Sequence, residues 1–249
     1  LDLESLNLKN IFDTPKPVSL IKLFIEVATD KNSIILDFFS GSSTSAHAVM
    51  YKNNEDNGNR KFIMIQLPEL TSHKSEAFKS GFKNICEIGK ERIRRAGKKI
   101  LEENKDSEEI ENLDIGFRVL KCDTSNMKDV YYNPQDIQQT MLDDMSDNIK
   151  DDRTSEDLLF QVMLDLGVEL SAKIEEREVQ GKKVFYVDDN YLVATFDKDI
   201  NDEIITEIAK QKPYYFVMRD SSLSGDSVSS LSSGVSVSLL SFSSGSSGS

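Results

Sequence analysis

The first third of the chain changes between helical and strand patterns of hydrophobic residues. From Val18 to Ala28, apolar residues recur at helical spacing directly after Pro15 and Pro17, which favour extended backbone and predict a helix start. Ser33 to Phe39 is a continuous apolar run, typical of a parallel strand that is covered on both faces. Arg60 to Glu69 has the pattern of the next parallel strand. A strand, a crossover and a second parallel strand predict an α/β fold.

The second half of the chain has the pattern of a smaller α+β domain. Ser155 and Glu156 are suited to cap a helix that runs from Asp157 to Leu166. Further predicted elements are paired strands at 173–187 and 191–196, with a hairpin over 185–196, an amphipathic helix at 201–210 that turns Ile204, Ile205 and Ile208 inward, and a final strand at 214–220.

These patterns divide the chain into two domains. We expect the first domain at residues 1–121 and the second at residues 122–220. Two charged segments are candidate breaks, one at 102–112 and one at 143–153.

The last segment, residues 221–249, has the composition of a low-complexity tail. Sixteen of its residues are Ser and four are Gly. Such a segment buries too little apolar surface to offset the entropy lost on ordering. We expect no function beyond about Val228, although five apolar residues of the tail have the pattern for local pairing: Val235, Val237, Leu239, Leu240 and Phe242.

The turn after the first strand has the composition of a ligand-binding loop. The strand ends at Asp37, and Ser40 to Ser45 are small residues that let backbone N–H groups approach a bound molecule. Ligands of open α/β sheets bind at this end of the strands. With only Gly41 and no following Lys, the turn lacks the patterns of dinucleotide and phosphate loops. Because Ser45 replaces the second glycine, it also departs from the nucleophile elbow of serine hydrolases.

Residues 37–44 resemble motif I of the amino-group DNA methyltransferases, D-x-F-x-G-S-G-T, which holds S-adenosylmethionine. The departure is Ser43, where the family usually has Gly. A Ser fits there without strain only if its backbone is not left-handed. The resemblance implies that the cofactor is bound by Asp37, Phe38, Phe39, Ser40, Gly41, Ser42 and Thr44.

Two flanking segments extend this resemblance. Phe12 to Val18, which contains Lys16 and Pro17, is similar to the K-P segment that precedes motif I in the β class and contributes to the cofactor pocket. Taken alone, the segment favours a Pro-initiated helix packed on the sheet, and its place beside motif I favours the cofactor role. Gln66 stands where a polar residue meets the ribose hydroxyls, roughly 20 to 25 positions further on. Lys16, Pro17 and Gln66 are therefore further candidate cofactor-binding residues.

The narrower resemblance is to the modification subunits of type III restriction systems. It covers most of residues 12–135, and the hairpin and final strand of the second domain are similar to the carboxyl-terminal part of the same subunits. The segments that carry it are Gln66 to Glu69, a basic helix at 85–100, and a strand at Gly116 to Lys121 followed by Asp123, Ser125 and Asn126.

This resemblance implies a partial, Rossmann-like S-adenosylmethionine-dependent methyltransferase sheet with a smaller C-terminal α+β domain. The parent enzyme would transfer a methyl group to adenine N6 in DNA. Its implied partners are duplex DNA, a second modification subunit and a restriction helicase-nuclease subunit, all in the cytoplasm. The residues alone do not separate adenine from cytosine amines, because both enzyme types share motif I.

The catalytic tetrapeptide of this family is absent from the sequence. Amino methyltransferases need a [DNS]-P-P-[YFW] loop to accept hydrogen bonds from the amine and to stack on the flipped base. The nearest approach, Tyr132-Asn133-Pro134, is better explained as a turn. In the β class this loop precedes motif I, and the chain opens at Leu1 without an initiator Met. We therefore expect the C-terminal part of a longer enzyme, inactive by itself.

A second hypothesis comes from a different class of protein. The chain would be a noncatalytic interaction module, in which a degenerate cofactor-binding fold carries an acidic C-terminal domain that binds a partner protein. The net charge of −13 and the pI near 4.7 are unfavourable for DNA binding. Basic residues gather between Lys90 and Lys99, which is the pattern of a solvated helix face as well as of a DNA contact. Most DNA contacts are expected in the part of the enzyme that precedes this chain.

Neither metal binding nor membrane insertion is indicated. Cys86 and Cys122 have no metal-ligand spacing and suit a reducing cytoplasm. His47 and His73 are too sparse for a ligand set, and His47, one turn into the predicted helix, is expected to be packed or solvent-facing. No apolar run approaches the roughly 18 residues of a membrane helix.

Overall fold

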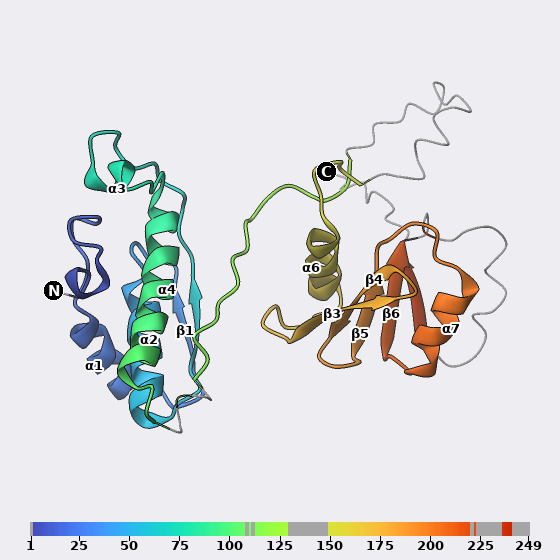
Figure 1. Ribbon diagram of the computed structural model, residues 1–249, viewed down its shortest axis with the longest axis horizontal. Coiled ribbons are helices and arrows are strands. Elements are labelled where there is room, and N and C mark those ends of the chain that lie inside the picture. Colours follow the sequence, from blue (N-terminus) through green and yellow to red (C-terminus); the bar gives the residue numbers. More distant parts are fainter. Residues whose placement is uncertain are drawn as a thin grey trace, which may run out of the picture. The chain divides into compact units, whose positions relative to one another are not determined.

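The computed structural model describes residues 2–107, 110, 113–128, 149–219 and 222, and the backbone of residues 236–240. The chain divides into two compact units, Leu1–Arg118 and Val119–Ser249. Each unit contains one sheet and the helices that pack on it, so the chain is of mixed α/β class (Figure 1).

The N-terminal unit is built on two parallel strands joined by a helix. Strand β1 (Ile34–Asp37) pairs with β2 (Lys61–Met64), and the register places Ile35 opposite Phe62. The crossover between them is helix α2 (Thr44–Asp56). The predicted strand, crossover and parallel strand are confirmed, and both strands end at the same edge of the sheet.

Helix α2 lies between the other long helices of this unit. On one side, α1 (Val18–Ala28) contributes Val18 and Ile25, which pack with Ala48 and Val49 of α2. On the other side are α4 (Ile85–Glu103) and the short 3-10 helix η1 (Glu4–Leu6); a further short helix is α3 (Glu76–Lys79). The predicted helices at 18–28 and 85–100 are confirmed. The second core contains Leu3, Leu6, Leu8, Ala46, Met50, Ile93, Ala96 and Ile100.

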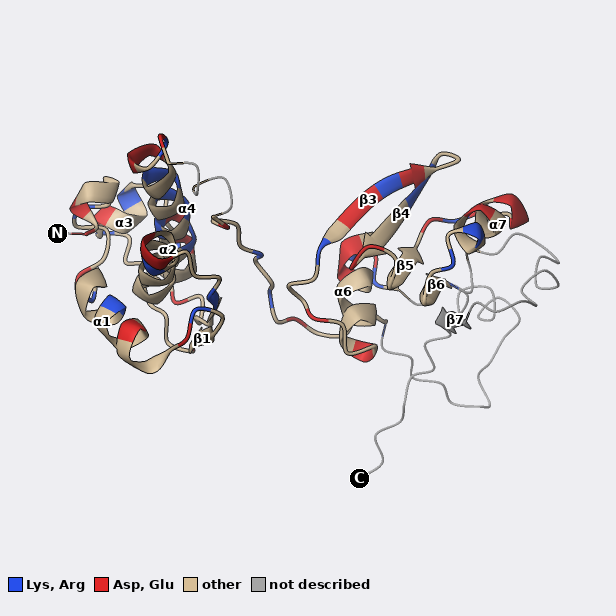
Figure 2. Cartoon of the chain, turned by 90° about the horizontal axis from the view of Figure 1, so that it is seen from below, with Lys and Arg blue, Asp and Glu red and all other residues tan. Residues whose placement is uncertain are grey.

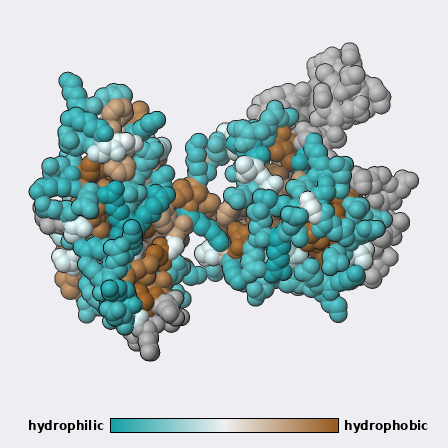
Figure 3. All heavy atoms as spheres, viewed as in Figure 1, coloured by the Kyte–Doolittle hydropathy of each residue, from teal (hydrophilic) through white to brown (hydrophobic). Residues whose placement is uncertain are grey.

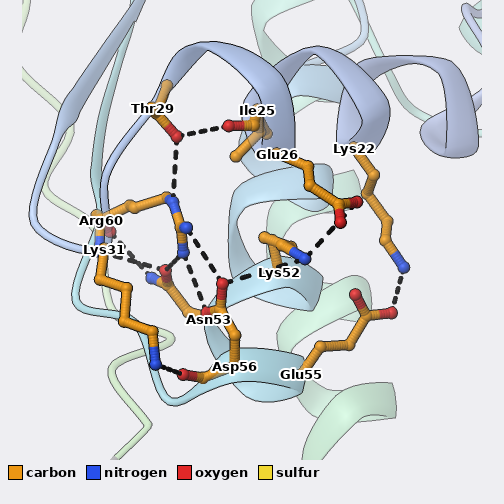
Figure 4. Close-up of polar contacts among 10 residues, drawn as sticks. All are labelled: Lys22, Ile25, Glu26, Thr29, Lys31, Lys52, Asn53, Glu55, Asp56 and Arg60. Atoms are coloured by element: carbon orange, nitrogen blue, oxygen red, sulfur yellow. Dashed lines mark hydrogen bonds and ion pairs between the residues drawn. The ribbon is translucent and has the colours of Figure 1, made fainter.

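A buried arginine closes the C-terminal end of α2 (Figure 4). The guanidinium of Arg60 donates to both carboxylate oxygens of Asp56, each at 3.0 Å, and to Thr29 Oγ1 at 3.1 Å. The Asn53 side chain bridges to the backbone of Arg60, accepting from its N–H at 3.1 Å and donating to its carbonyl at 2.9 Å. These bonds fix the C-terminal end of α2 to the start of β2.

One face of the two-stranded sheet is exposed and apolar. The side chains of Ile34 and Ile63 are 62% and 49% exposed, and Leu36 lies between them on the same face. Ile35 and Phe62 point the other way, into the core with α1 and α2. The prediction of a strand covered on both faces is therefore wrong for the described residues, because their helices cover only one. Figure 3 shows hydrophobic side chains that reach the surface of this unit.

The C-terminal unit has a five-stranded sheet with one helix on each face. Helix α6 (Ser155–Asp165) packs on one face through a core that includes Leu159, Met163 and Phe185. Helix α7 (Asp202–Lys210) packs on the other through Ile204, Ile205 and Ile208, which confirms the predicted inward face. The strands lie in the order β3 (Ile174–Val179), β4 (Lys182–Val187), β5 (Leu192–Thr195), β6 (Tyr215–Arg219) and β7 (Ser236–Leu240).

The predicted hairpin over 185–196 is confirmed as β4 and β5, but the strand predicted at 173–187 is divided by a turn into β3 and β4, and the sheet has the further strand β7. β3, β4 and β5 are antiparallel, and the turn between β3 and β4 is Gln180-Gly181, with positive φ at both residues, as a tight hairpin requires. β5, β6 and β7 are parallel. β7 lies within the segment for which composition predicts no packed structure, and its backbone is paired along β6 from Tyr215 to Arg219.

Two local predictions are wrong. The helix predicted at 157–166 is present, but its cap is Thr154, whose hydroxyl accepts from the Asp157 N–H while the Asp157 carboxylate accepts from the Thr154 N–H. Residues 116–121 form no strand, since no described strand pairs with them. The predicted turn at Tyr132-Asn133-Pro134 and most of the break at 143–153 lie outside the described residues. Among the helices that the structure describes, none has the length and apolarity to cross a membrane.

The exposed sheet face leads to a stability prediction. Ile34→Thr should change the unfolding free energy of the N-terminal unit by less than about 0.5 kcal/mol, since it replaces an exposed side chain with another β-branched one. Ile93→Thr, at a position 3% exposed, should cost about 2 to 5 kcal/mol. Urea unfolding followed by circular dichroism at low protein concentration measures both. Equal losses would mean that the sheet face is covered in solution.

Candidate functional site

The site is formed where β1 ends and α2 begins. Asp37, the last residue of β1, accepts a hydrogen bond from the Phe39 N–H at 3.2 Å and one from the Ser45 hydroxyl at 2.5 Å. The turn itself is closed by the Ser43 N–H, which donates to the Ser40 carbonyl at 2.7 Å. The Asp37 carboxylate thus ties the end of the strand to the first turn of the helix, with residues 38–43 as a loop between them.

Gln66 joins this loop from the second strand. Its side-chain oxygen accepts from the Gly41 N–H at 2.7 Å, and its amide nitrogen donates to the Leu67 carbonyl at 3.2 Å. The Ser40 N–H also donates to the Ile65 carbonyl at 3.2 Å. The residues after β2 therefore hold the loop through one backbone bond and one side-chain bond. The structure therefore brings Gln66 to the loop through the amide oxygen, which is already bonded to the protein.

The segment before α1 reaches the loop through Phe12. A methyl group added at Gly41 would lie 3.3 Å from the Phe12 ring, and Gly41 has φ of +50°. Both the close ring and the positive φ favour glycine at this position. Lys16 and Pro17 lie at the start of α1, where Pro17 is the cap residue and both are exposed. Their segment touches the loop at Phe12, a residue that the sequence interpretation did not select.

Ser43 has a left-handed backbone, with φ of 58° and ψ of 43°. The condition under which a Ser fits here without strain is therefore not met, and the conformation costs roughly 1 to 2 kcal/mol. Gly89 of α4 leaves the space for this residue, because a Cβ at that position would lie 2.5 Å from the Ser43 hydroxyl oxygen. Ser43 is the N-cap residue of α2, but its hydroxyl accepts no hydrogen bond from the N–H groups of the first turn.

Arg92 of α4 lies directly beneath the loop and is fully buried. Its Nη1 donates to the Ser42 hydroxyl at 2.9 Å and to the Thr44 hydroxyl at 2.7 Å, and its Nε donates to His47 Nδ1 at 3.4 Å. The predicted site residues Ser42 and Thr44 thus turn their hydroxyls toward the protein interior. Burial lowers the pKa of Arg92 to about 10, which leaves it charged at neutral pH.

Sequence reasoning missed Arg92 because it counted this residue among the basic residues of a solvated helix face. A usable signal is the spacing of Gly89, Arg92, Ile93 and Ala96, which places all four on the side of α4 that faces the core. His47 is packed, as expected. Burial lowers its pKa to about 3, with the Arg92 charge acting in the same direction, so it is neutral.

The outer side of the loop carries aromatic rings. The side chains of Phe38 and Phe39 are 60% and 80% exposed, and their ring centroids lie 5.2 Å apart. The Cys86 thiol donates to the Gln66 carbonyl at 3.3 Å and is not paired with a second cysteine. Within the described part of the chain, no cluster of three or more candidate metal ligands is found. Exposed rings beside a small-residue turn at the ends of parallel strands can bind a flat organic ligand.

Residues 2–96, which contain this site, match the DNA methylase family. Over 109 residues the chain is 46% identical to the Mod subunit of the type III restriction-modification enzyme StyLTI of Salmonella typhimurium; this covers 44% of the chain and 16% of that subunit. It is 39% identical over 119 residues to the EcoPI Mod subunit of Escherichia phage P1, covering 48% and 18%. To the type II methyltransferase M.KpnI of Klebsiella pneumoniae it is 40% identical over 78 residues, covering 31% and 19%.

Each match spans less than a fifth of the curated relative. The predicted resemblance to amino-group DNA methyltransferases, and to type III modification subunits in particular, is confirmed for this part of the chain.

The close approach of Ser43 and Gly89 predicts a coupling between them. Gly89→Ala gains about 1 kcal/mol of helix propensity, but it displaces the Ser43 hydroxyl at a cost of about 0.5 to 1.5 kcal/mol. We expect almost no net change in stability with Ser43 present and a gain of about 1 kcal/mol in a Ser43→Gly background. Thermal unfolding of the wild type, the two single variants and the double variant measures the coupling. Strictly additive effects would show that the hydroxyl moves without cost.

The neutral, buried His47 predicts a dependence of stability on pH. The pKa falls from 6.5 to about 3 on folding, so the unfolded state takes up a proton that the folded state does not. Stability is full above pH 6.5 and declines below it, by up to about 1.4 kcal/mol per pH unit from this residue. Urea unfolding at several pH values from 7 to about 5.5, above the range in which most carboxylates titrate, measures the slope.

His47→Gln should remove this slope, and His73→Gln is the matched control, because His73 is exposed. An equal slope in the wild type and in His47→Gln would exclude His47 as its source.

Proposed function

We propose that the N-terminal unit is the S-adenosylmethionine-binding part of a DNA methyltransferase, a modification subunit of a type III restriction-modification system. The observation that carries this proposal is the loop from Asp37 to Thr44. Its motif is held at the ends of two parallel strands, Gln66 bonds to it, and the segment that contains it is similar to Mod subunits over about 110 residues. The reaction of the whole enzyme is methyl transfer to adenine N6 in DNA.

The parallel strands and their helical crossover support a Rossmann-like methyltransferase sheet. The proposed domain limits are 1–121 for the cofactor-binding part and 122–220 for the C-terminal α+β domain, with 221–249 as a tail. The division of the contacts after Arg118 supports a boundary near the first limit.

The residues at the loop fit a ligand with a flat ring system and a polar tail. Phe38 and Phe39 present exposed rings, whereas Ser40, Ser42 and Ser43 behind them are buried, so the proposed contact with the ring system is through the two aromatic side chains. Asp37 and Gln66 hold the loop in place, and the Gln66 amide nitrogen can still serve ribose hydroxyls. Lys16 and Pro17 complete the proposed wall on the α1 side. The cofactor supplies an activated methyl group; this chain binds and orients it.

The proposed roles of Ser42 and Thr44 differ from those of the other candidates. Their hydroxyls bond to Arg92, so these residues act through their backbone and through the position of the loop. No [DNS]-P-P-[YFW] tetrapeptide occurs in the sequence, and the chain alone is expected to bind cofactor without transferring methyl groups.

The net negative charge of the chain is concentrated in the C-terminal unit. Residues 1–118 have 18 Lys and Arg against 19 Asp and Glu, whereas residues 119–249 have 12 against 24. Acidic residues follow one another along β3, where Glu175, Glu176 and Glu178 flank Arg177 (Figure 2). Such a surface is unfavourable for DNA. We propose that duplex DNA is bound mainly outside this chain, in the cytoplasm, with a second modification subunit and a restriction helicase-nuclease subunit as partners.

Isothermal titration of the 249-residue chain with S-adenosylmethionine tests the proposal. We expect saturable binding, and we expect Asp37→Ala to weaken it at least tenfold, because a charge-assisted hydrogen bond of about 1.5 to 3 kcal/mol that shapes the loop is lost. Asp30→Ala is the matched control. Asp30 is an exposed residue that precedes the same strand, and the hydrogen bonds it forms with Ser33 use its backbone.

Absence of binding by a folded chain would contradict the proposal and favour the noncatalytic interaction module. The same conclusion follows if Asp37→Ala and Asp30→Ala bind equally well.

A further inference from the structure

Arg92 is a buried cation that is not matched by a carboxylate. Its side chain is fully buried, and within the described residues it forms no ion pair. Among the residues that the structure describes, the acid that acts on its pKa is Asp2, which instead accepts a hydrogen bond from the Val18 N–H at 2.8 Å. Removing a guanidinium from water costs several kcal/mol, as an order of magnitude, unless partners compensate. Stability therefore does not explain why an arginine occupies this buried position.

The partners of Arg92 all belong to one short stretch of chain. Ser42 lies in the loop, Thr44 is the first residue of α2, and His47 is one turn further on. The three bonds therefore connect α4 to the last part of the loop and to the first turn of the helix that follows. The Nη2 atom of Arg92 and the Nε2 atom of His47 are buried and have no hydrogen-bond partner in the described part of the chain, so this arrangement is not the one that best satisfies the polar groups.

The packing around Arg92 brings α4 close to the same stretch. Gly89 lies one turn before Arg92 on α4, and the absence of its side chain lets Ser43 approach the helix backbone. After Arg92, Ile93 and Ala96 pack in the core with Ala46 of α2. One face of α4 thus packs against the end of the loop. Arg92 makes the polar contacts of this face, and Ile93 and Ala96 make apolar contacts further along the helix.

We propose that Arg92 is a positioning residue for the cofactor loop. It bonds Ser42 and Thr44 from below, so that the left-handed turn at Ser43 is held and the outer side of the loop stays open to the ligand. This inference rests on the proposed function where it concerns the cofactor. The positioning of the loop is a property of the chain without any ligand, and it is tested separately.

Hydrogen exchange of the 249-residue chain, followed by mass spectrometry, tests the positioning. In Arg92→Met, the amides of residues 39–47 should exchange at least tenfold faster, since charge-assisted hydrogen bonds to the loop are lost. Arg92→Lys keeps the charge with a single donor group and should give an intermediate rate. The control is Lys98→Met, which removes a charge from the exposed side of the same helix and should leave these amides unchanged.

A second readout separates positioning from a merely structural role. Replacing buried charged groups by well-packed apolar side chains of similar volume is often neutral or stabilising. We therefore expect the urea midpoint of Arg92→Met to be unchanged or higher while exchange in residues 39–47 becomes faster. If exchange is unchanged, or becomes faster throughout the N-terminal unit together with a lower midpoint, Arg92 supports the core and the inference is wrong.

The loop side of the contact gives a coupled test. Ser42→Ala combined with Thr44→Val should accelerate exchange in residues 39–47 as Arg92→Met does, and adding Arg92→Met should have little further effect, since the same bonds are already lost. Additive effects would show that Arg92 acts elsewhere and would contradict the inference.

Titration with S-adenosylmethionine then decides the role toward the cofactor. Arg92→Met should bind at least tenfold more weakly than the wild type, and Lys98→Met equally well. If the wild type binds and Arg92→Met binds with the same affinity, the positioning role is wrong and the proposed function stands. If the wild type does not bind, the proposed function fails, and the exchange experiment alone decides whether Arg92 holds the loop.

Discussion

Helix α2 is packed by α1 on one side, by α4 on the other and by the sheet, and the rest of the N-terminal unit depends on this burial. The helices approach closely because α2 presents the small residues Ala46 and Ala48 to its neighbours. Val49 and Met50 follow in the sequence and are buried in the same two cores. A helix enclosed in this way has fixed ends. Arg60 and Asp56 anchor its C-terminal end, and its N-terminal end continues directly into the loop at Ser43. The shape of the site is therefore a consequence of helix packing.

The sheet contributes less to stability than its position suggests. Two strands are rarely stable by themselves, and here one of their faces is exposed. Its function is geometric, because two parallel strands that end at one edge bring Asp37 and Gln66 to the same loop. The bond between the Gln66 side chain and Gly41 links the two strand ends across the loop.

Much of the fold follows from the sequence, since periodic hydrophobic patterns reflect burial. They locate α1, α7 and the hairpin over 185–196, while the resemblance to modification subunits locates α4 and motif I locates the loop. They do not locate β7, which has a composition close to that of a linker. The strand that the resemblance implies at 116–121 does not form, because no described strand pairs with these residues. The conformation of Ser43 and the burial of Arg92 depend on contacts between residues more than 40 positions apart, between the loop and α4, to which local patterns are insensitive.

The unequal charge of the two units has a consequence for how the chain moves near any polyanion. A nearly neutral N-terminal unit is subject to little net force, whereas the acidic C-terminal unit is repelled. The difference produces a torque that turns the nearly neutral N-terminal unit toward the polyanion before contact. This torque acts over about one Debye length, which is about 8 Å at physiological salt. The chain is therefore oriented most strongly in dilute buffer, and the orientation weakens as ionic strength rises.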